Sequence, residues 1–198
     1  MPEATRTLKI LVMAHIGTGV EYGLHCLLWL VDPETGRASV RELAELQGIS
    51  PSYVAKIFPK LEKSGIVAAQ EGLTGGYKLA KRADKITVLE VIEAIDGKKP
   101  LFECQEIRGR CAVFGDKAPR WSTKGVCAIH AVMLRAEQVM REELRQTTLA
   151  DIAQAVGQKA PAGFAGEIRN WLAGRVDQRS QARLAGIAHA KEARQLDS

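Results

Sequence analysis

The sequence predicts a mainly α-helical fold: a winged helix-turn-helix with a two-stranded wing and a long dimerisation helix. Three observations support this prediction. Residues 39–65 form two short amphipathic segments across a glycine-containing turn, residues 66–81 have a glycine-rich hairpin pattern, and apolar residues recur at three- and four-residue steps after residue 126. These patterns are typical of a helix pair, a β-hairpin and a long amphipathic helix, respectively.

The composition fits one ordinary core with an appendage. The chain has 198 residues, 46% of them hydrophobic, and a net charge of +5. A mild basic excess is compatible with nucleic acid binding. Because the sequence has neither a run of about 18 apolar residues nor a secretory leader, we expect a cytoplasmic protein that makes no contact with a membrane.

The first helical segments carry clear end signals. Gly19–Val31 predicts a helix, and Asp32–Gly36 predicts a turn. Ser39 and Glu42 have the spacing of a capping box, in which each side chain bonds the other residue's backbone N–H. The short helix that they open is expected to end at Gly48.

The second helix of the pair is the candidate recognition helix. It begins at Ser50-Pro51, a serine N-cap followed by a proline whose missing N–H costs nothing in the first turn. Pro59 lies inside this helix and predicts a bend. The N-terminal residues of such a helix face base edges, and its later lysines reach phosphates. The candidate DNA-binding residues here are Ser50, Ser52, Tyr53, Ala55, Lys56, Lys60 and Lys63.

A wing is expected to follow. Ile66–Glu71 and Tyr77–Lys81 predict short strands, and the glycines between them predict a hairpin. We assign two of these glycines, Gly75 and Gly76, to the DNA-contacting surface. Thr87-Val88-Leu89-Glu90 is a second capping box, which opens a helix that ends at Asp96-Gly97.

The remaining organisation follows from periodicity. The long helix has an apolar stripe and is the candidate dimer face; the stripe comprises Val126, Ile129, Met133, Ala136, Met140 and Leu144. The tail contains one amphipathic pattern near Phe164–Val176, and residues 177–198 are polar enough to fray. The predicted parts are an N-terminal extension (1–12), the winged helix-turn-helix (13–100), a cluster-binding loop (101–125), the dimerisation helix with a short following helix (126–157), and the tail (158–198).

Three cysteines and one histidine lie together in a polar stretch. The spacing is Cys104, six residues, Cys111, fifteen residues, Cys127, two residues, His130. Cys127 and His130 are three apart at the start of a predicted helix, so both side chains share one face and can reach one centre. Three thiols and an imidazole are suitable ligands for a metal ion or an iron–sulfur cluster. The fourth cysteine, Cys26, lies in an apolar run and is interpreted as a core residue.

Two species compete for this ligand set. Zinc accepts three thiolates and one imidazole, usually from two tight ligand pairs. Only one tight pair occurs here, which favours an iron–sulfur cluster held by a loop. A structural zinc site or a thiol redox switch stays an alternative. An iron–sulfur electron carrier or enzyme is more distant, since the sequence has no phosphate loop, nucleophile elbow or acid/base pair beside the cysteines. We expect neither enzymatic activity nor a small-molecule substrate.

The chain resembles the bacterial winged-helix regulators that include IscR, NsrR and RirA. Four stretches within residues 17–156 carry the resemblance: VRELAELQGISPSYVAKIFPKLEKSGIV, GLTGGYKLAK, ITVLEVIEAIDG and CAIHAVMLRAEQVMREELRQTTLADI. The resemblance implies a homodimer that binds a double-stranded DNA operator, acts as a repressor and senses redox or cofactor state. It also implies a 2Fe–2S cluster whose ligands are Cys104, Cys111, Cys127 and His130.

Three features depart from that family. The gap between Cys111 and Cys127 is longer, so residues 112–126 are interpreted as an insertion that loops out from the site. Glu71 stands where wings of the family often carry an arginine, and phosphates would repel its carboxylate. The tail after Gly157 lies outside the resemblance.

Overall fold

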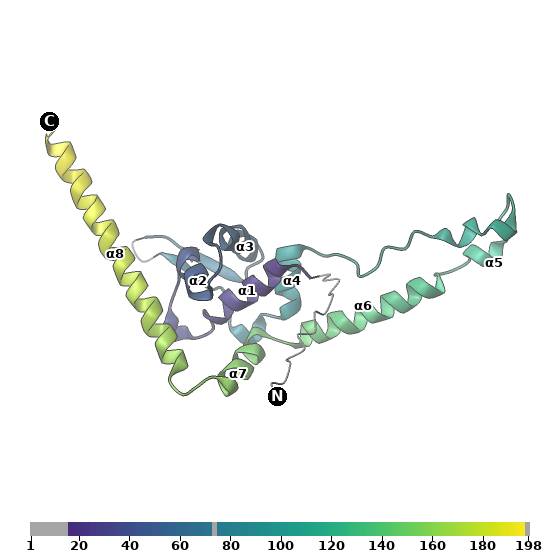
Figure 1. Cartoon of the computed structure of the whole chain (residues 1–198), viewed down its shortest axis with the longest axis horizontal. Helices are drawn as coiled ribbons and strands as arrows, with labels where there is room; N and C mark the ends of the chain where they lie inside the picture. Colours follow the sequence, from purple (N-terminus) through teal and green to yellow (C-terminus); the bar gives the residue numbers. More distant parts are fainter. Residues whose placement is uncertain (1–15, 73–74, 197–198) are drawn as a thin grey trace, which may run out of the picture.

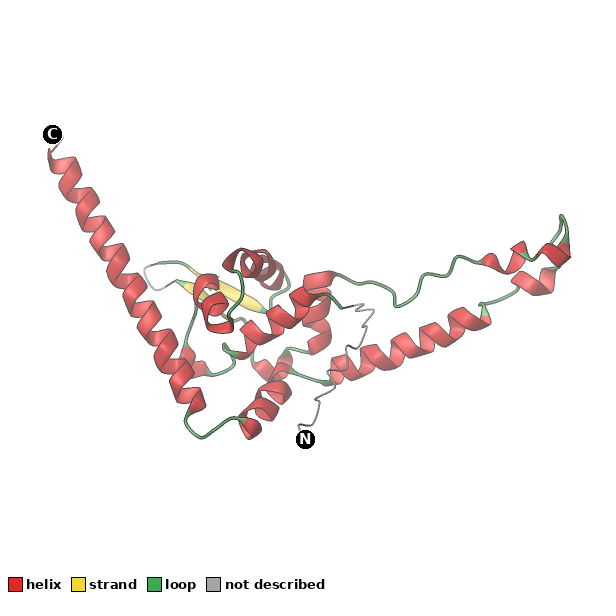
Figure 2. Ribbon diagram, in the orientation of Figure 1, coloured by secondary structure: helices red, strands yellow, loops and turns green. Residues whose placement is uncertain are grey.

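The computed structural model describes residues 16–72 and 75–196, so the predicted extension 1–12 lies outside it. A helical body carries two arms that project in different directions (Figure 1). One arm ends in the cysteine-containing loop, and the other is a single long helix at the C-terminus (Figure 2). No helix in the described ranges is both long and apolar enough to cross a membrane.

The helix-turn-helix forms with the end signals that the sequence predicts. Its helices are α1 (Thr18–Leu28), α2 (Val40–Gln47) and α3 (Pro51–Lys63), with a short 3-10 turn, η1 (Pro33–Thr35), after α1. Glu42 N donates to Ser39 Oγ at 3.2 Å, and Ser39 N donates to Glu42 Oε2 at 2.7 Å, which confirms the capping box. Gly48 ends α2 in the left-handed region, at φ 69°, where glycine is favoured.

The wing is an antiparallel pair of four-residue strands, β1 (Val67–Gln70) and β2 (Gly76–Leu79). Both strands are shorter than predicted. An isolated bridge between Ala38 and Tyr77 ties the hairpin to the segment before α2. Gly76 permits this contact, because a Cβ there would lie 2.8 Å from the carbonyl carbon and oxygen of Ala38.

The remaining helices follow the predicted order. They are η2 (Ala83–Lys85), α4 (Val88–Asp96), η3 (Ile107–Arg110), η4 (Ala112–Phe114), α5 (Arg120–Thr123), α6 (Ala128–Gln146), α7 (Leu149–Lys159) and α8 (Phe164–Leu196). Capping boxes begin α4 at Thr87 and α7 at Thr148. Val88 N donates to Thr147 O at 2.9 Å, and Leu149 N donates to Ile86 O at 2.8 Å, so the starts of α4 and α7 are paired.

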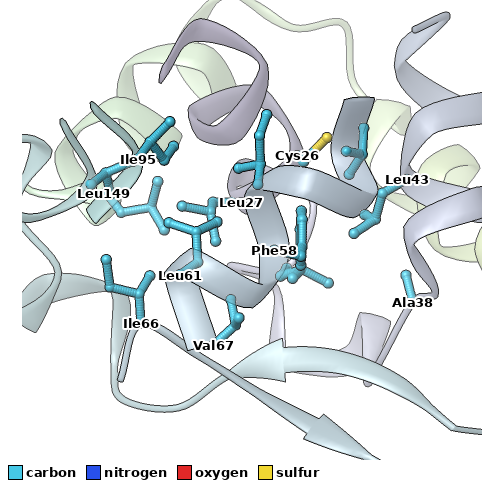
Figure 3. Packing of buried hydrophobic residues seen from close by; sticks show 14 of the residues in the cluster. Cys26, Leu27, Ala38, Leu43, Phe58, Leu61, Ile66, Val67, Ile95 and Leu149 are labelled. Atoms are coloured by element: carbon cyan, nitrogen blue, oxygen red, sulfur yellow. The ribbon is translucent and has the colours of Figure 1, made fainter. Parts of the chain in front are cut away.

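The core lies where α1, α3 and α4 meet the wing (Figure 3). Helix α3 contributes its apolar face, and Phe58 and Leu61 are fully buried. Cys26 on α1 is also fully buried, and burial raises the pKa of its thiol to about 12. Its interpretation as a core residue is therefore confirmed.

The apolar stripe predicted for α6 is buried to different extents along the helix. Met133, Met140 and Leu144 are half-buried. The last two lie beside α4. Ile129 and Val139 are 63% and 71% exposed. Ile129 shares a helical face with Met133 and Met140 but lies nearer the N-terminal end of α6. Helix α6 has no fully buried residue, and Met140 and Leu144 of its predicted stripe lie beside α4 of the same chain.

The tail differs most from expectation, because it forms one helix of 33 residues rather than a short helix with a frayed end. Its first turns pack on the body through Leu172, which is 1% exposed, and through Ile168 and Trp171. Arg169 Nη1 donates to Asp32 Oδ2 at 2.7 Å. Alanine, glutamine, arginine and leucine predominate beyond this anchor, and their helix propensities are high.

Gly76→Ala tests the close approach of the wing to Ala38. The added Cβ would press on backbone atoms, so we expect the free energy of unfolding to fall by about 1–3 kcal/mol. Gly174→Ala is the matched control, since a Cβ at this helical position meets nothing within 4 Å. It should stabilise the chain by about 0.5–1 kcal/mol. Urea unfolding of both variants measures this, and equal destabilisation would contradict the packing argument.

Asp32→Asn tests the anchor of α8 through its pH dependence. Burial acts to raise the pKa of Asp32, but the Arg169 guanidinium and the Glu34 N–H outweigh it and lower the pKa below its ordinary value. The ionised carboxylate therefore adds stability at neutral pH, and this contribution is lost as pH falls through the carboxyl range near about 4. Unfolding midpoints of the two proteins should converge on acidification. A difference that stays constant down to that range would contradict the expectation.

Candidate nucleic-acid interface and metal centre

The candidate recognition helix presents its predicted polar face. Ser50, Ser52, Ala55, Lys56 and Lys63 are all exposed. The hydroxyl oxygens of Ser50 and Ser52 lie 2.8 Å apart, and neither hydroxyl caps the helix. The first turn of α3 thus offers hydroxyl groups and a lysine to an outside partner.

Two of the predicted residues also have contacts inside the protein. The Tyr53 ring packs edge-on against Tyr22 with ring centroids 5.2 Å apart, and 40% of Tyr53 stays exposed. Lys60 Nζ donates to the carbonyl oxygen of Ile95 at 2.7 Å, which places its charge at the C-terminal end of α4. A cation is stabilising at that end of a helix. Lys60 therefore joins α3 to α4.

The wing glycines are explained by the fold itself. A Cβ on Gly75 would lie 2.5 Å from the carbonyl oxygen of Gln70, and Gly76 faces Ala38 as described above. Glu71 is exposed beside them. The close contacts account for both glycines without reference to DNA.

The loop between α4 and α6 carries Cys104 and Cys111 and returns to the start of α6, where Cys127 and His130 lie. Phe102 packs near His130 with ring centroids 6.0 Å apart. The charges of Cys104 and Cys127 both act on Arg108, and the charge of His130 acts on Glu106. Cys127 and His130 lie one helical turn apart at the start of α6, and the Glu106–Arg108 pair lies near them.

Arg108 is the organising residue of this loop, and sequence reasoning missed it. Its guanidinium donates to both carboxylate oxygens of Glu106, at 2.5 and 2.8 Å. It also donates to the carbonyl oxygen of Gly125 at 2.9 Å, which closes the loop over 17 residues. Glu106 has a φ of 47°, the left-handed region that non-glycine residues rarely adopt. In the sequence, the acidic and basic pair Glu106 and Arg108 between two cysteines would have indicated an ion pair in this loop.

Cys127 occupies the N-cap of α6. The backbone N–H of His130, together with that of Ile129 and the nearby Arg108 charge, lowers the pKa of the Cys127 thiol below its ordinary value. The start of a helix favours an anion for the same reason. This position therefore favours the thiolate, which is the form that binds metals.

The fourth predicted ligand, Cys111, is exposed. Across residues 16–72 and 75–196, no three His, Cys, Asp or Glu side chains are preassembled around a metal position. Three thiols and an imidazole nevertheless fit a cluster or a zinc ion by their donor chemistry. Ligands commonly come together only when the metal binds.

The segment between Cys111 and Cys127, which the sequence predicts to loop out from the site, has local structure of its own. It contains η4 and α5, and Phe114 packs edge-on against Trp121 with ring centroids 5.8 Å apart. Ser122 is buried and donates to the carbonyl oxygen of Pro119 at 2.8 Å. Trp121 is itself 73% exposed.

Comparison with known proteins identifies relatives for most of the chain. The profile of the Rrf2 family, described as iron-dependent transcriptional regulators, matches residues 16–155. The HTH-type transcriptional regulator IscR of Klebsiella pneumoniae is 34% identical over 122 residues, which are 62% of this chain and 68% of the relative.

Solved structures support the same fold. The global cysteine regulator CymR of B. subtilis has a TM-score of 0.57 and 25% identity, over 72% of this chain and 98% of that one. IscR of T. potens has a TM-score of 0.56 and 23% identity, over 74% and 91% of the two chains. These relatives regulate transcription and are not enzymes. The chain belongs to the Rrf2 family and is a winged-helix transcriptional regulator of the IscR-like type.

Proposed function

We propose that this regulator binds its operator under the control of an iron–sulfur cluster, 2Fe–2S in type, held by Cys104, Cys111, Cys127 and His130. The observation that carries this proposal is the closure of the loop by Arg108, which follows Cys104 by four residues and donates to the carbonyl oxygen of Gly125 at 2.9 Å, two residues before Cys127 at the N-cap of α6. A cluster bound there would supply redox and iron chemistry. The residues of the chain supply the ligands and the route to the DNA-binding surface.

Two bonds connect this region to α4. Leu101 N, at the beginning of the loop, donates to Glu137 Oε2 on α6 at 3.1 Å. Arg141 on α6 forms an ion pair with Glu93 on α4. Within residues 16–72 and 75–196 no three of the candidate ligands are preassembled, so the loop conformation must change if all four are to bind one centre.

A third bond continues to the recognition helix, through Lys60 on α3 and the Ile95 carbonyl on α4. A change at the start of α6 can therefore alter the placement of α3. In a dimer, the two α3 helices must match half-sites about 34–36 Å apart, so a small displacement changes the affinity for DNA.

We further propose that the protein acts as a homodimer through α6. The exposed face of this helix carries Ile129, Val132, Ala136 and Val139, spaced three and four residues apart. Such a stripe of exposed apolar residues favours burial against a second helix. The DNA-contacting residues would be Ser50, Ser52, Tyr53, Lys56 and Lys63, with Gly75 and Gly76 in the wing and a smaller role for Lys60.

Lys56→Ala and Lys60→Ala form a matched pair that separates DNA contact from structure. Lys56 is exposed on α3, so its loss should weaken DNA binding and reduce the salt slope by about 1. Lys60 binds Ile95, so its loss should lower the free energy of unfolding by on the order of 1–2 kcal/mol. The probe is a duplex of about 40 base pairs selected from a random library by the unaltered protein. Identical behaviour of the two variants would contradict this division.

Cys127→Ala tests the cofactor. Protein purified without oxygen should contain iron and sulfide and absorb visible light, whereas the variant should lose all three signals because one anchoring thiolate is gone. Cys26→Ala is the matched control, since Cys26 is buried in the core away from the loop. Retention of iron by Cys127→Ala, or its loss from Cys26→Ala, would contradict the ligand set.

The switch is tested by operator affinity. The anaerobic protein should bind the selected duplex with different affinity before and after removal of iron, because ligand assembly reshapes the loop that adjoins α4. Equal affinity in the two states would overturn the switch and leave DNA binding intact.

A thiol redox switch is the second candidate, and the lowered pKa of Cys127 favours it. A thiolate reacts with oxidants and other thiols far faster than a thiol does. A colourless protein whose DNA binding responds to peroxide would identify this alternative. A colourless protein with stoichiometric zinc would identify a structural zinc site.

A further inference from the structure

We propose that α8 is a brace for the DNA-binding surface, in which Arg179 and Arg183 fix the wing relative to α2 and so set the affinity for DNA. The proposal concerns a helix that lies beyond the family match at residues 16–155. It rests on DNA binding by the winged helix and is independent of what the cysteines hold.

The brace is firmly attached at its start. Leu172 is buried in the core, and Arg169 Nη1 lies 2.7 Å from Asp32 Oδ2 and 3.3 Å from Glu34 Oε2. The Arg175 guanidinium lies 5.0 Å from the centre of the Trp171 ring, in a cation–π contact. Leu172 and Arg169 fix the direction in which α8 leaves the body. The helix then runs along α2 towards the wing (Figure 1).

Three arginines at four-residue spacing lie on one face of α8: Arg175, Arg179 and Arg183. The partners of these arginines lie successively closer to the wing. Arg175 pairs with Glu45 near the end of α2, and Arg179 Nη1 lies 2.8 Å from Glu42 Oε1 near its start. Arg183 Nη1 donates to the carbonyl oxygen of Gly72 in the wing at 2.6 Å.

The middle pair is the most buried of the three. The side chains of Arg179 and Glu42 are 18% and 6% exposed. All three guanidinium nitrogens of Arg179 are buried without an aligned hydrogen bond, so charge holds this pair. The other oxygen of Glu42 accepts the Ser39 N–H in the capping box of α2. Arg179 therefore contacts Glu42, the residue whose other carboxylate oxygen caps the start of α2.

The wing needs such support. Its strands pack on the core through Val67 and Leu79, but Gly72 at its turn is exposed. Gly72, which accepts the Arg183 bond, has a φ of 109°, a conformation that costs glycine little but does not make the turn rigid. A groove of about 370 Å³ separates the wing from α8, and Arg179 and Arg183 line it. The wing and α8 thus meet through these arginines rather than through a packed interface. The position of the wing relative to α8 therefore depends on single side chains.

Arg183→Ala and Arg175→Ala are the test pair. Both remove one positive charge from the same helix, but only Arg183 reaches the wing. We expect Arg183→Ala to bind the selected duplex about tenfold more weakly than the unaltered protein, the factor that corresponds to one lost charged hydrogen bond. Arg175→Ala should bind within about twofold, because its ion pair with Glu45 is largely exposed. Hydroxyl-radical footprints should show weaker protection under the wing in Arg183→Ala alone.

Arg183→Lys provides a third measurement. A lysine retains a charged donor towards Gly72, so it should recover most of the affinity, which a purely steric role of Arg183 would not predict. All affinities are compared with the cysteines in the same state, so a lack of response to iron leaves the comparison intact. Equal affinity of Arg183→Ala and Arg175→Ala would overturn the brace. Failure of the unaltered protein to select any duplex would instead overturn the DNA binding on which the brace depends.

Discussion

The position of helix α4 on α1 is the constraint from which the rest of the molecule follows. The two helices approach so closely that a Cβ at Gly23 would lie 2.5 Å from Ile95 Cδ1, and one at Gly19 would lie 3.3 Å from Ile95 Cγ2. Helix α4 then holds α3 through Lys60, α6 through Glu93, and the start of α7 through its backbone. The recognition helix α3 and the arm that carries the thiols are therefore both attached to the short helix α4.

Local signals made the helix-turn-helix predictable. Ser39 with Glu42, and Thr87 with Glu90, satisfy backbone groups within three residues, so the sequence contains all the information that their helices need to begin. The left-handed end of α2 at Gly48 is local in the same way. The spacing of Cys127 and His130 likewise predicted that they share one face at the start of a helix, and Cys127 is the N-cap of α6 with His130 in its first turn.

Long-range contacts were not predictable from such signals. The role of Lys60 depends on a carbonyl 35 residues away, and that of Arg108 on a carbonyl 17 residues away. The stripe of α6 was read as one face, but its half-buried part, with Met140 and Leu144, lies beside α4 of the same chain. The length of α8 was underestimated because polar residues were taken to indicate fraying, whereas their helix propensity and the ion pairs to α2 favour a continuous helix.

The two arms leave the body from opposite ends of the DNA-binding unit (Figure 2). The arm with the thiols joins α4, whereas α8 grips α2 and the wing from the other side. Residues added after α7 can therefore change the strength of the grip without touching the thiol ligands or the helix α6. The contacts named for the two arms share no residue, so a substitution in one set leaves the contacts of the other in place.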